Sequence, residues 1–434
     1  MTLTVAMIAR DEAAHLGRCL ASVQGLADEI VLVDTGSRDA TVEIARSFGA
    51  QVAAIPWADD FSAARNAGLE RATGDWILVL DADEALDGRD HGAVRAAMAA
   101  EGAQAYRVLI RNYLPSGDFT MMDGEARPNP GGYGEGDAYP LCADTRAVRL
   151  FRNHPWARFT CRIHEMVDPA FLARGIPLPD LDTVIHHLGF TLADRIEAKK
   201  PRYLELARRD AADRVGDHQA QFHLLLQAAA AQVWPLALEA ADRCLALVPA
   251  GPPTVTLTRA VALQRLERHG EAVLAFADHL AVHPDNLPAA NGLAVSLERL
   301  GKGAEARGIL EALVREHPAF ATPCLDLADL LVRAGEAGAA RKALEGAVAA
   351  SPRDPALRGR LVRLGLETGD VGQAAKDAWE ALGACGGAGD PGWPRLVVLH
   401  LLRRGAREEA LAVLALGLEA FPGNPDLLRL KELA

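Results

Sequence analysis

The stretch Gly74–Gly88, GDWILVLDADEALDG, joins an apolar run directly to a group of acids. The run Trp76–Leu80 is short and uninterrupted, which is typical of a strand that is buried on both faces of a sheet. Asp81, Asp83 and Glu84 follow at once. Charged groups beside a buried strand need partners, so we expect these carboxylates to bind something at the strand's end.

Three further segments of the first half share this apolar pattern. They read LTVAMIA, EIVLVD and QVAAIP, at residues 3–9, 29–34 and 51–56. Helical patterns separate them, at residues 11–23 and 39–49. This alternation predicts an α/β domain with a parallel sheet, whose strands are buried on both faces. Ligands bind such sheets beyond the carboxyl ends of the strands, so Asp34 and Asp81 are expected at the ligand edge.

The spacing of Asp81 and Asp83 favours a cation site. In an extended or turning backbone, side chains two residues apart point the same way, so both carboxylates can reach one hard cation or its waters. A divalent ion there can bridge a diphosphate and neutralise the charge of a departing nucleotide. The alternative is a turn or capping cluster in which Asp81 or Asp83 begins a following helix.

The second half of the chain repeats with a period of about 34 residues. Prolines stand in phase at Pro249, Pro284, Pro318, Pro352 and Pro422. An alanine precedes each by twelve residues: Ala237, Ala272, Ala306, Ala340 and Ala410. Ala374 keeps this phase, although Gly386 replaces its proline. Glycines expected in the turns between helices are Gly270, Gly301, Gly335, Gly369 and Gly405. A small residue where helices cross and a helix-ending proline indicate tetratricopeptide repeats.

These repeats imply a second domain. Each helix pair cannot bury its apolar face alone, so the pairs stack into a superhelix with a concave surface. We expect an α/β domain over residues 1–200 and about six helix pairs over residues 201–434, closed by the helix PDLLRLKELA. Such repeats bind peptides or proteins, or mediate self-association, so a homodimer is one option.

Composition narrows the class of partner and compartment. The chain has 434 residues and a net charge of -12, which argues against nucleic-acid or anionic-membrane binding. Its six cysteines are scattered, which is typical of buried thiols in a reducing compartment. The longest apolar stretch, residues 224–241, is interrupted by polar residues and proline. We therefore expect a cytoplasmic protein without a signal peptide or an integral membrane segment.

Several motifs together carry a family resemblance. AMIARDEAAHLGRCLASV, IVLVDTGSRDATVEIA and WADDFSAARNAGLERATGDWILVLDADE occupy residues 6–23, 30–45 and 57–84. Together they resemble the family-2 glycosyltransferases of the GT-A fold, in the branch that carries tetratricopeptide repeats. RLFRNHPWARFTCRIHEMV and VIHHLGF, at residues 149–167 and 184–190, are also similar to segments of that branch. The resemblance implies sugar transfer from a nucleotide-sugar donor, with inversion, assisted by Mn²⁺ or Mg²⁺.

The resemblance also implies roles for donor-binding residues. Asp34 matches the acid that contacts the base or ribose of the donor; the alternative is an acid that closes a turn at the strand end. Ala9 and Arg10 match the loop beside the nucleotide. Arg65 and Asn66 match a pair near the donor, where Arg65 can pair with phosphate; the alternative is an exposed helix arginine. Asp81 matches the acid toward the ribose or metal, and Asp83 matches the metal ligand.

The catalytic base is expected in one of the late motifs. RIHEMV offers His164 and Glu165, whose side chains would point to opposite faces if this segment is a strand. Our order is Glu165 as base, then His164 as base or metal ligand. VIHHLGF offers His186 and His187, and a late histidine in relatives sometimes completes the metal shell, a role for which His187 is the candidate.

Residues 111–140 are rich in glycine and proline, and we expect either a lid over the donor or acceptor or a passive insertion. The acceptor is a protein, a glycan or a lipid-linked sugar, and the repeats are candidates for recruiting it. The main rival is a scaffold that binds a nucleotide-sugar without catalysis. A nucleotidyltransferase is disfavoured, because residues 6–17 lack the glycine-rich basic phosphate loop typical of such enzymes.

Overall fold

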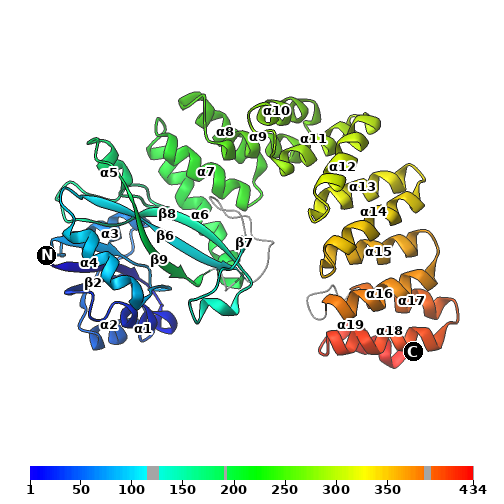
Figure 1. The fold of residues 1–434 in the computed structure, drawn as a ribbon, viewed down its shortest axis with the longest axis horizontal. Helices are drawn as coiled ribbons and strands as arrows, with labels where there is room; N and C mark the ends of the chain where they lie inside the picture. Colours follow the sequence, from blue (N-terminus) through cyan, green and yellow to red (C-terminus); the bar gives the residue numbers. More distant parts are fainter. Residues whose placement is uncertain (115–126, 190–192, 386–391, 434) are drawn as a thin grey trace. The chain divides into compact units, whose positions relative to one another are not determined.

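The computed structural model describes residues 1–114, 127–189, 193–385 and 392–433. It divides into two compact units, Met1–Gly251 and Pro252–Ala434, each drawn in Figure 1. Helix α6 (Ala193–Asp213) runs through residue 200, and α6, α7 (His218–Ala230) and α8 (Trp234–Leu247) belong to the first unit. The compact units therefore divide at residue 251, while the boundary at 200 stays a prediction about where the repeats begin.

The four strands expected in the first half are present. They are β1 (Leu3–Ala9), β2 (Glu29–Asp34), β3 (Gln51–Ala54) and β4 (Trp76–Val79). They pair in parallel in the order β3-β2-β1-β4. β4 is buried along its whole length, whereas the ends of β3 are exposed. The prediction of burial on both faces is wrong for β3, because it is the edge strand.

The sheet continues with strands that the sequence did not predict. β8 (Leu141–Arg152) pairs antiparallel with β4, followed in order by β6 (Ala105–Leu114), β9 (Asp180–His187) and β5 (Glu84–Leu86). β7 (Arg127–Pro128) pairs with β8. The fold is therefore a mixed sheet, and β5 follows the acids directly. The alternative that Asp81 or Asp83 begins a helix is wrong, since the next element is a strand.

Helices cover both faces of the sheet. They are α1 (Ala13–Ser22), α2 (Thr41–Ser47), α3 (Phe61–Leu69), α4 (His91–Ala99) and α5 (Asp168–Leu172), with 3₁₀ turns η1 (Gly88–Asp90) and η2 (Gly136–Ala138). Trp76 and Leu78 pack in one core with α1 and α4, whereas Ile77 and Val79 pack in another with α3 and α5. This alternation has the period of two that a strand dictates.

The second unit consists of helix pairs in tandem. The helices are α9 (Pro253–Arg265), α10 (His269–Val282), α11 (Leu287–Arg299), α12 (Gly303–Glu316), α13 (Ala321–Arg333), α14 (Ala337–Ala350), α15 (Pro355–Glu367), α16 (Val371–Cys385), α17 (Gly392–Arg403), α18 (Arg407–Ala420) and α19 (Pro425–Leu433). The six in-phase alanines are completely buried. Each in-phase proline stands two residues beyond a helix end, for example Pro284 after α10. The α/β domain followed by helical repeats is thus confirmed; Gly386 lies outside the described residues.

Four of the five predicted turn glycines lie in the turns between paired helices, and one does not. Positive φ angles, between 76° and 79°, occur at Gly301, Gly335, Gly369 and Gly405. Gly270, however, lies inside α10, and the equivalent turn position is Glu267, with φ of 59°. The left-handed turn is therefore kept without its glycine, at a cost in backbone strain.

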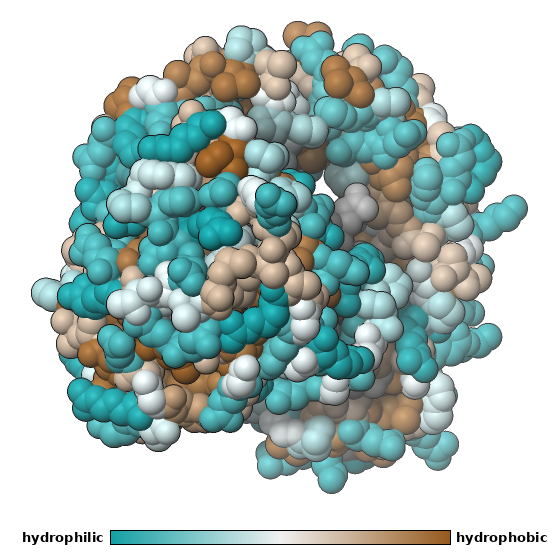
Figure 2. All heavy atoms as spheres, turned by 60° about the vertical axis from the view of Figure 1, so that its left-hand side comes forward, coloured by the Kyte–Doolittle hydropathy of each residue, from teal (hydrophilic) through white to brown (hydrophobic). Residues whose placement is uncertain are grey.

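The surface in Figure 2 shows hydrophilic residues with hydrophobic ones scattered among them. Within the described residues, no helix is both long and apolar enough to cross a membrane. All six cysteines are free thiols, and five of them are buried.

Candidate functional site

The acid Asp81 is held by two arginines at the carboxyl end of β4. Arg65 Nη2 donates to Asp81 Oδ1 at 2.5 Å, and Arg149 Nη2 lies 3.6 Å from Asp81 Oδ2. Although desolvation opposes ionisation, the charges of Arg65 and Arg149 hold the pKa of Asp81 well below its usual range. Asp81 is therefore a carboxylate at neutral pH.

Arg65 joins this acid to the late motif. It comes from α3, its side chain is only 7% exposed, and its Nε donates to Glu165 Oε1 at 2.9 Å. The alternative of an exposed helix arginine is wrong. In this structure its charge is shared by Asp81 and Glu165, so the sequence-based pairing with phosphate remains a proposal.

Arg149 is a functional candidate that the sequence reasoning missed. It lies on β8, one residue before Leu150, which pairs with Leu78 of β4. Its Nη2 also donates to Glu84 Oε1 at 2.9 Å, and the Glu84 side chain is almost completely buried. Burial raises the pKa of Glu84 against the opposing charge of Arg149. No local pattern marks Arg149, although it opens the RLFRNHP segment.

Asp83 faces His187 across the pairing of β5 with β9. In that pairing Glu84 lies opposite His187, and Asp83 Oδ2 lies 3.5 Å from His187 Nε2. The His187 Nδ1 hydrogen-bonds Asn112 Oδ1 at 2.7 Å, while the Asn112 amide donates to the Ala143 carbonyl. The amide oxygen therefore accepts from Nδ1, which directs Nε2 toward Asp83. This second interaction of the ring is the arrangement that orients metal-binding histidines.

This pair fits a divalent cation. Two ligand atoms that each bind one ion at about 2.1 Å lie about 3–3.5 Å apart, close to the observed gap. A Cβ on Gly189 would lie 2.4 Å from Asp83 Oδ2 and 2.5 Å from His187 Nε2, so only glycine keeps this space open. Burial opposes protonation of His187, yet the neighbouring Asp83 carboxylate raises its pKa, which shows that this place favours positive charge.

The predicted three-ligand set is not assembled as one cluster. Asp81 is paired with arginines, whereas Asp83 is paired with His187. In the part of the chain that the structure describes, the ligand atoms of these three residues do not all lie within 4.8 Å of one another. The metal roles of Asp81, Asp83 and His187 stay predictions.

Part of the glycine-rich segment packs beside Asp83. Residues 111–114 belong to β6 rather than to a loop, and residues 115–126 lie outside the described residues. Arg18 on α1 donates from Nη2 to the Asp83 carbonyl at 2.7 Å and from Nη1 to Glu135 at 2.8 Å. The Tyr133 ring stacks on His186 with centroids 3.6 Å apart. The segment thus contacts His186 directly and Asp83 through Arg18, and its role as a lid remains a proposal.

The predicted nucleotide loop lies at the ends of β1 and β2. Ala9 pairs with Asp34, and the Ala9 carbonyl accepts from Thr35. The Asp34 carboxylate accepts from the Gly36 and Ser37 amides, at 3.2 and 3.1 Å. Asp34 therefore makes the turn bonds expected of a strand-end acid, and its contact with the donor stays a prediction. Arg10 is exposed, with its Nε 3.8 Å from Asp11 Oδ2.

Asn66 and His164 contact other parts of the chain. The Asn66 amide exchanges two hydrogen bonds with the Phe159 backbone, at 2.9 and 3.0 Å, which fastens α3 to the late motif. His164 Nε2 bonds Gln227 on α7 at 2.9 Å. The backbone of His164 bends, with φ of 52°, rather than extending as a strand. His164 and Glu165 still diverge, and only Glu165 joins the network of Asp81.

Comparisons with known proteins complete the description of the first unit. Residues 4–147 match the model of glycosyl transferase family 2. Residues 4–147 form a family 2 glycosyltransferase domain. This range includes β1 to β4, the acids and Arg18 of the site. The late motif with Glu165 and the histidines of β9 lie beyond the matched range of the glycosyltransferase domain.

Two relatives resemble this chain outside the glycosyltransferase domain as well. A TPR repeat-containing protein of Synechococcus elongatus is 36% identical over 249 residues, which cover 56% of this chain and 55% of the relative. A prophage-derived glycosyltransferase, SunS, of Bacillus subtilis is 28% identical over 209 residues, covering 47% of this chain and 44% of the relative. The chain thus spans about half the length of these relatives. The solved structure of the type IV pilus biogenesis factor PilW covers 49% of this chain at 20% identity, with a TM-score of 0.38.

Proposed function

We propose that this chain transfers a sugar from a nucleotide-sugar donor to a protein, glycan or lipid-linked acceptor, with inversion at the anomeric carbon. The observation that carries the proposal is the Asp83–His187 pair, oriented by Asn112, in which Asp83 and Asn112 lie within the range that matches family 2 glycosyltransferases. We assign Asp83 and His187 to hold a divalent cation, Mn²⁺ or Mg²⁺. When bound, the cation neutralises charge on the diphosphate as it departs.

The ion-pair network supplies the other roles. Arg65 and Arg149 fix Asp81 in its ionised form, in a position to contact the ribose or to bind water of the cation. Arg65 also holds Glu165 through Oε1. We assign Glu165 Oε2 to take the proton of the acceptor group as that group bonds to the anomeric carbon and the nucleotide diphosphate leaves with its electron pair.

The helical repeats are proposed to recruit the acceptor. Stacked helix pairs present side chains over an extended surface, which suits the binding of a peptide or protein. SunS of Bacillus subtilis is named a glycosyltransferase, which supports the reaction class without identifying the acceptor.

The test is nucleotide release from UDP-, GDP-, dTDP- and CMP-sugars, with Mn²⁺, with Mg²⁺ and with a chelator. Release is expected from one donor, only with metal, and is expected to disappear in Asp83→Asn. Asp182→Asn, which changes an exposed acid on the same strand as His187, is the matched control and is expected to leave release unchanged. The absence of both turnover and metal-dependent nucleotide binding would instead favour the scaffold.

A further inference from the structure

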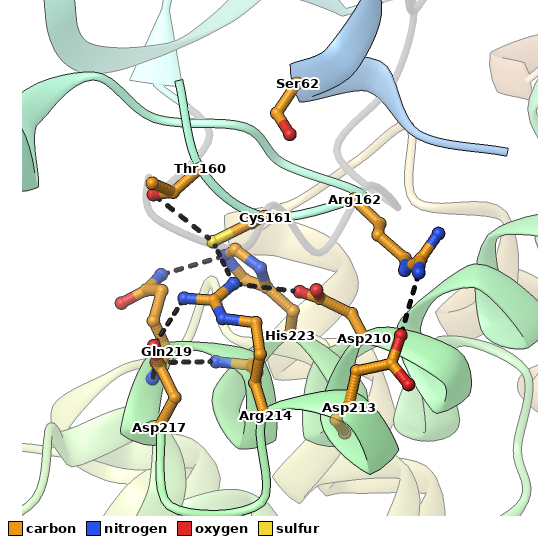
Figure 3. A network of polar contacts seen from close by, with 12 residues as sticks. Ser62, Thr160, Cys161, Arg162, Asp210, Asp213, Arg214, Asp217, Gln219 and His223 are labelled. Atoms are coloured by element: carbon orange, nitrogen blue, oxygen red, sulfur yellow. Dashed lines mark hydrogen bonds and ion pairs between the residues drawn. The ribbon is translucent and has the colours of Figure 1, made fainter. Parts of the chain in front are cut away.

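A second cluster of metal-ligating side chains lies between the late motif and the helices that follow it. Cys161 comes from the loop after β8, Asp210 from α6 and His223 from α7 (Figure 3). Their ligand atoms all lie within 4.8 Å of one another. The three residues are 5%, 2% and 3% exposed. We propose that Cys161, Asp210 and His223 bind a transition-metal ion of the zinc type, separate from the cation site of Asp83.

The donor atoms determine the class of metal. A thiolate, an imidazole and a carboxylate are the ligands that Zn²⁺ takes in proteins, in sets of three with water or in sets of four. Mg²⁺ and Ca²⁺ prefer oxygen ligands and bind sulfur poorly. The site therefore differs in chemistry from the carboxylate and histidine pair at the end of β4.

A positive charge already lies in this cluster. Arg214 Nη1 donates to Cys161 Sγ at 3.0 Å and to Asp210 Oδ2 at 3.2 Å. Arg214 Nη2 also donates to Asp217, and its side chain is 29% exposed. We infer that the guanidinium neutralises the cluster when no metal is bound. It can turn outward and remain paired with Asp217 when a metal ion replaces it.

The imidazole has unused capacity. The Gln219 amide donates from Nε2 to His223 Nε2 at 2.8 Å, so Nδ1 carries the ring proton here. Metal binding through Nδ1 requires that proton to leave and the Gln219 amide to turn its oxygen toward Nε2. His223 Nδ1 is buried, and its contact with the Ile163 backbone is too poorly aligned to count as a full hydrogen bond. A buried nitrogen without a well-aligned partner is uncommon in native proteins, and binding of an ion is one way to satisfy it.

The backbone of Cys161 also indicates that the thiol is held in place. Its φ is 77°, a conformation that side-chain-bearing residues rarely adopt. Such strain persists only where the surroundings enforce it. Here the strained turn directs the sulfur toward α6 and α7, with Thr160 Oγ1 at 4.0 Å as its remaining polar neighbour.

A metal ion here would fasten the loop of Glu165 to the helices. Glu165 lies four residues after Cys161, and Arg162 of the same loop already pairs with Asp213 of α6 at 2.8 Å. The ion would reinforce this pair and the bond of His164 to Gln227 of α7. Its role is therefore structural, and its detection needs no assumption about the reaction.

The test is titration of the full chain with Co²⁺ after removal of metal with a chelator. The expected result is a thiolate-to-cobalt charge-transfer band that corresponds to one Co²⁺ per chain and that an equivalent of Zn²⁺ removes. The Asp83 site contains no sulfur and cannot give this band. Cys161→Gly, which removes the thiol and suits the positive φ, is expected to abolish the band. His223→Gln is expected to weaken binding by about a hundredfold or more.

Two further variants make the test decisive. Cys324→Ala removes another buried thiol, on α13, and is expected to keep the band. Arg214→Gln removes the competing charge; it is expected to lower Tm without metal and to regain it with Zn²⁺. The proposal is overturned if excess Co²⁺ gives no thiolate band, if the band survives in Cys161→Gly, or if Zn²⁺ leaves the Tm of Arg214→Gln unchanged.

Discussion

Gly189 provides a direct test of the space between Asp83 and His187. The change Gly189→Ala adds one methyl group and removes no hydrogen-bonding group. Gly189 does not have positive φ, so alanine suits its backbone. Any effect should therefore arise from the space that the methyl group fills.

The size of the effect follows from the two contacts of the added carbon. It would lie 2.4 Å from Asp83 Oδ2 and 2.5 Å from His187 Nε2, whereas ordinary van der Waals contacts begin at about 3.4 Å. Both side chains must therefore move by about 1 Å. Misplacement of about 1 Å in a catalytic site costs about a hundredfold in rate, or about 2.7 kcal/mol in transition-state stabilisation.

The assay combines binding with turnover. Calorimetry with Mn²⁺ and the nucleotide is expected to show at least about tenfold weaker binding, and nucleotide release is expected to fall about a hundredfold. Gly92→Ala is the control, because nothing lies within 4 Å of its added carbon in α4. Tm should change little, since the crowded atoms are the ends of side chains. Wild-type metal binding and turnover in Gly189→Ala would refute the assignment of this space to a cation.

Three other predictions concern stability. Arg149→Met leaves buried Glu84 without its cationic partner, although the Asp81 amide still donates to it, so we expect a loss of about 3 kcal/mol in thermal unfolding, largely recovered when Glu84→Gln is added. Glu267→Gly relieves a positive φ and should raise the stability of the repeats by about 0.5–1 kcal/mol. Gly335→Ala places a side chain at a positive φ and should lower the stability. Equal Tm values for the two variants would contradict this. Burial lowers the pKa of His164 to about 4, so the folded protein keeps this ring neutral while the unfolded chain takes up a proton below about pH 6.5. The stability is therefore full above about pH 6.5 and falls as the pH drops toward 4. His164→Gln should therefore reduce the fall in stability between about pH 7 and 5 by about 2 kcal/mol, measured as the change in Tm.

The elements with local patterns were predictable from the sequence. β1, β2 and β4 follow from runs of apolar residues, and the repeats follow from alanines and prolines in phase. Both patterns depend on side chains that are near one another in the chain. The acids after β4 were also found this way, because their position at a strand end is a local property.

Long-range pairing was not predictable in the same way. The approach of His187 to Asp83 depends on the pairing of β5 with β9, and these two strands are far apart in the sequence. Arg149 reaches Asp81 because β8 pairs antiparallel with β4. Asn112 orients His187 because β6 pairs with β9. None of these pairings leaves a periodic signal in the sequence.

The sequence by itself determined which residues could form strands, helix pairs and a charged strand end, because hydrophobic period and turn chemistry act over a few residues. Only the tertiary structure decided which charges meet. Arg65 could have been an exposed helix residue, and it is buried between Asp81 and Glu165. Asp34 could have been open to a ligand, and its carboxylate closes a turn. The partner of a charge depends on packing between distant segments, and neighbouring residues do not encode that packing.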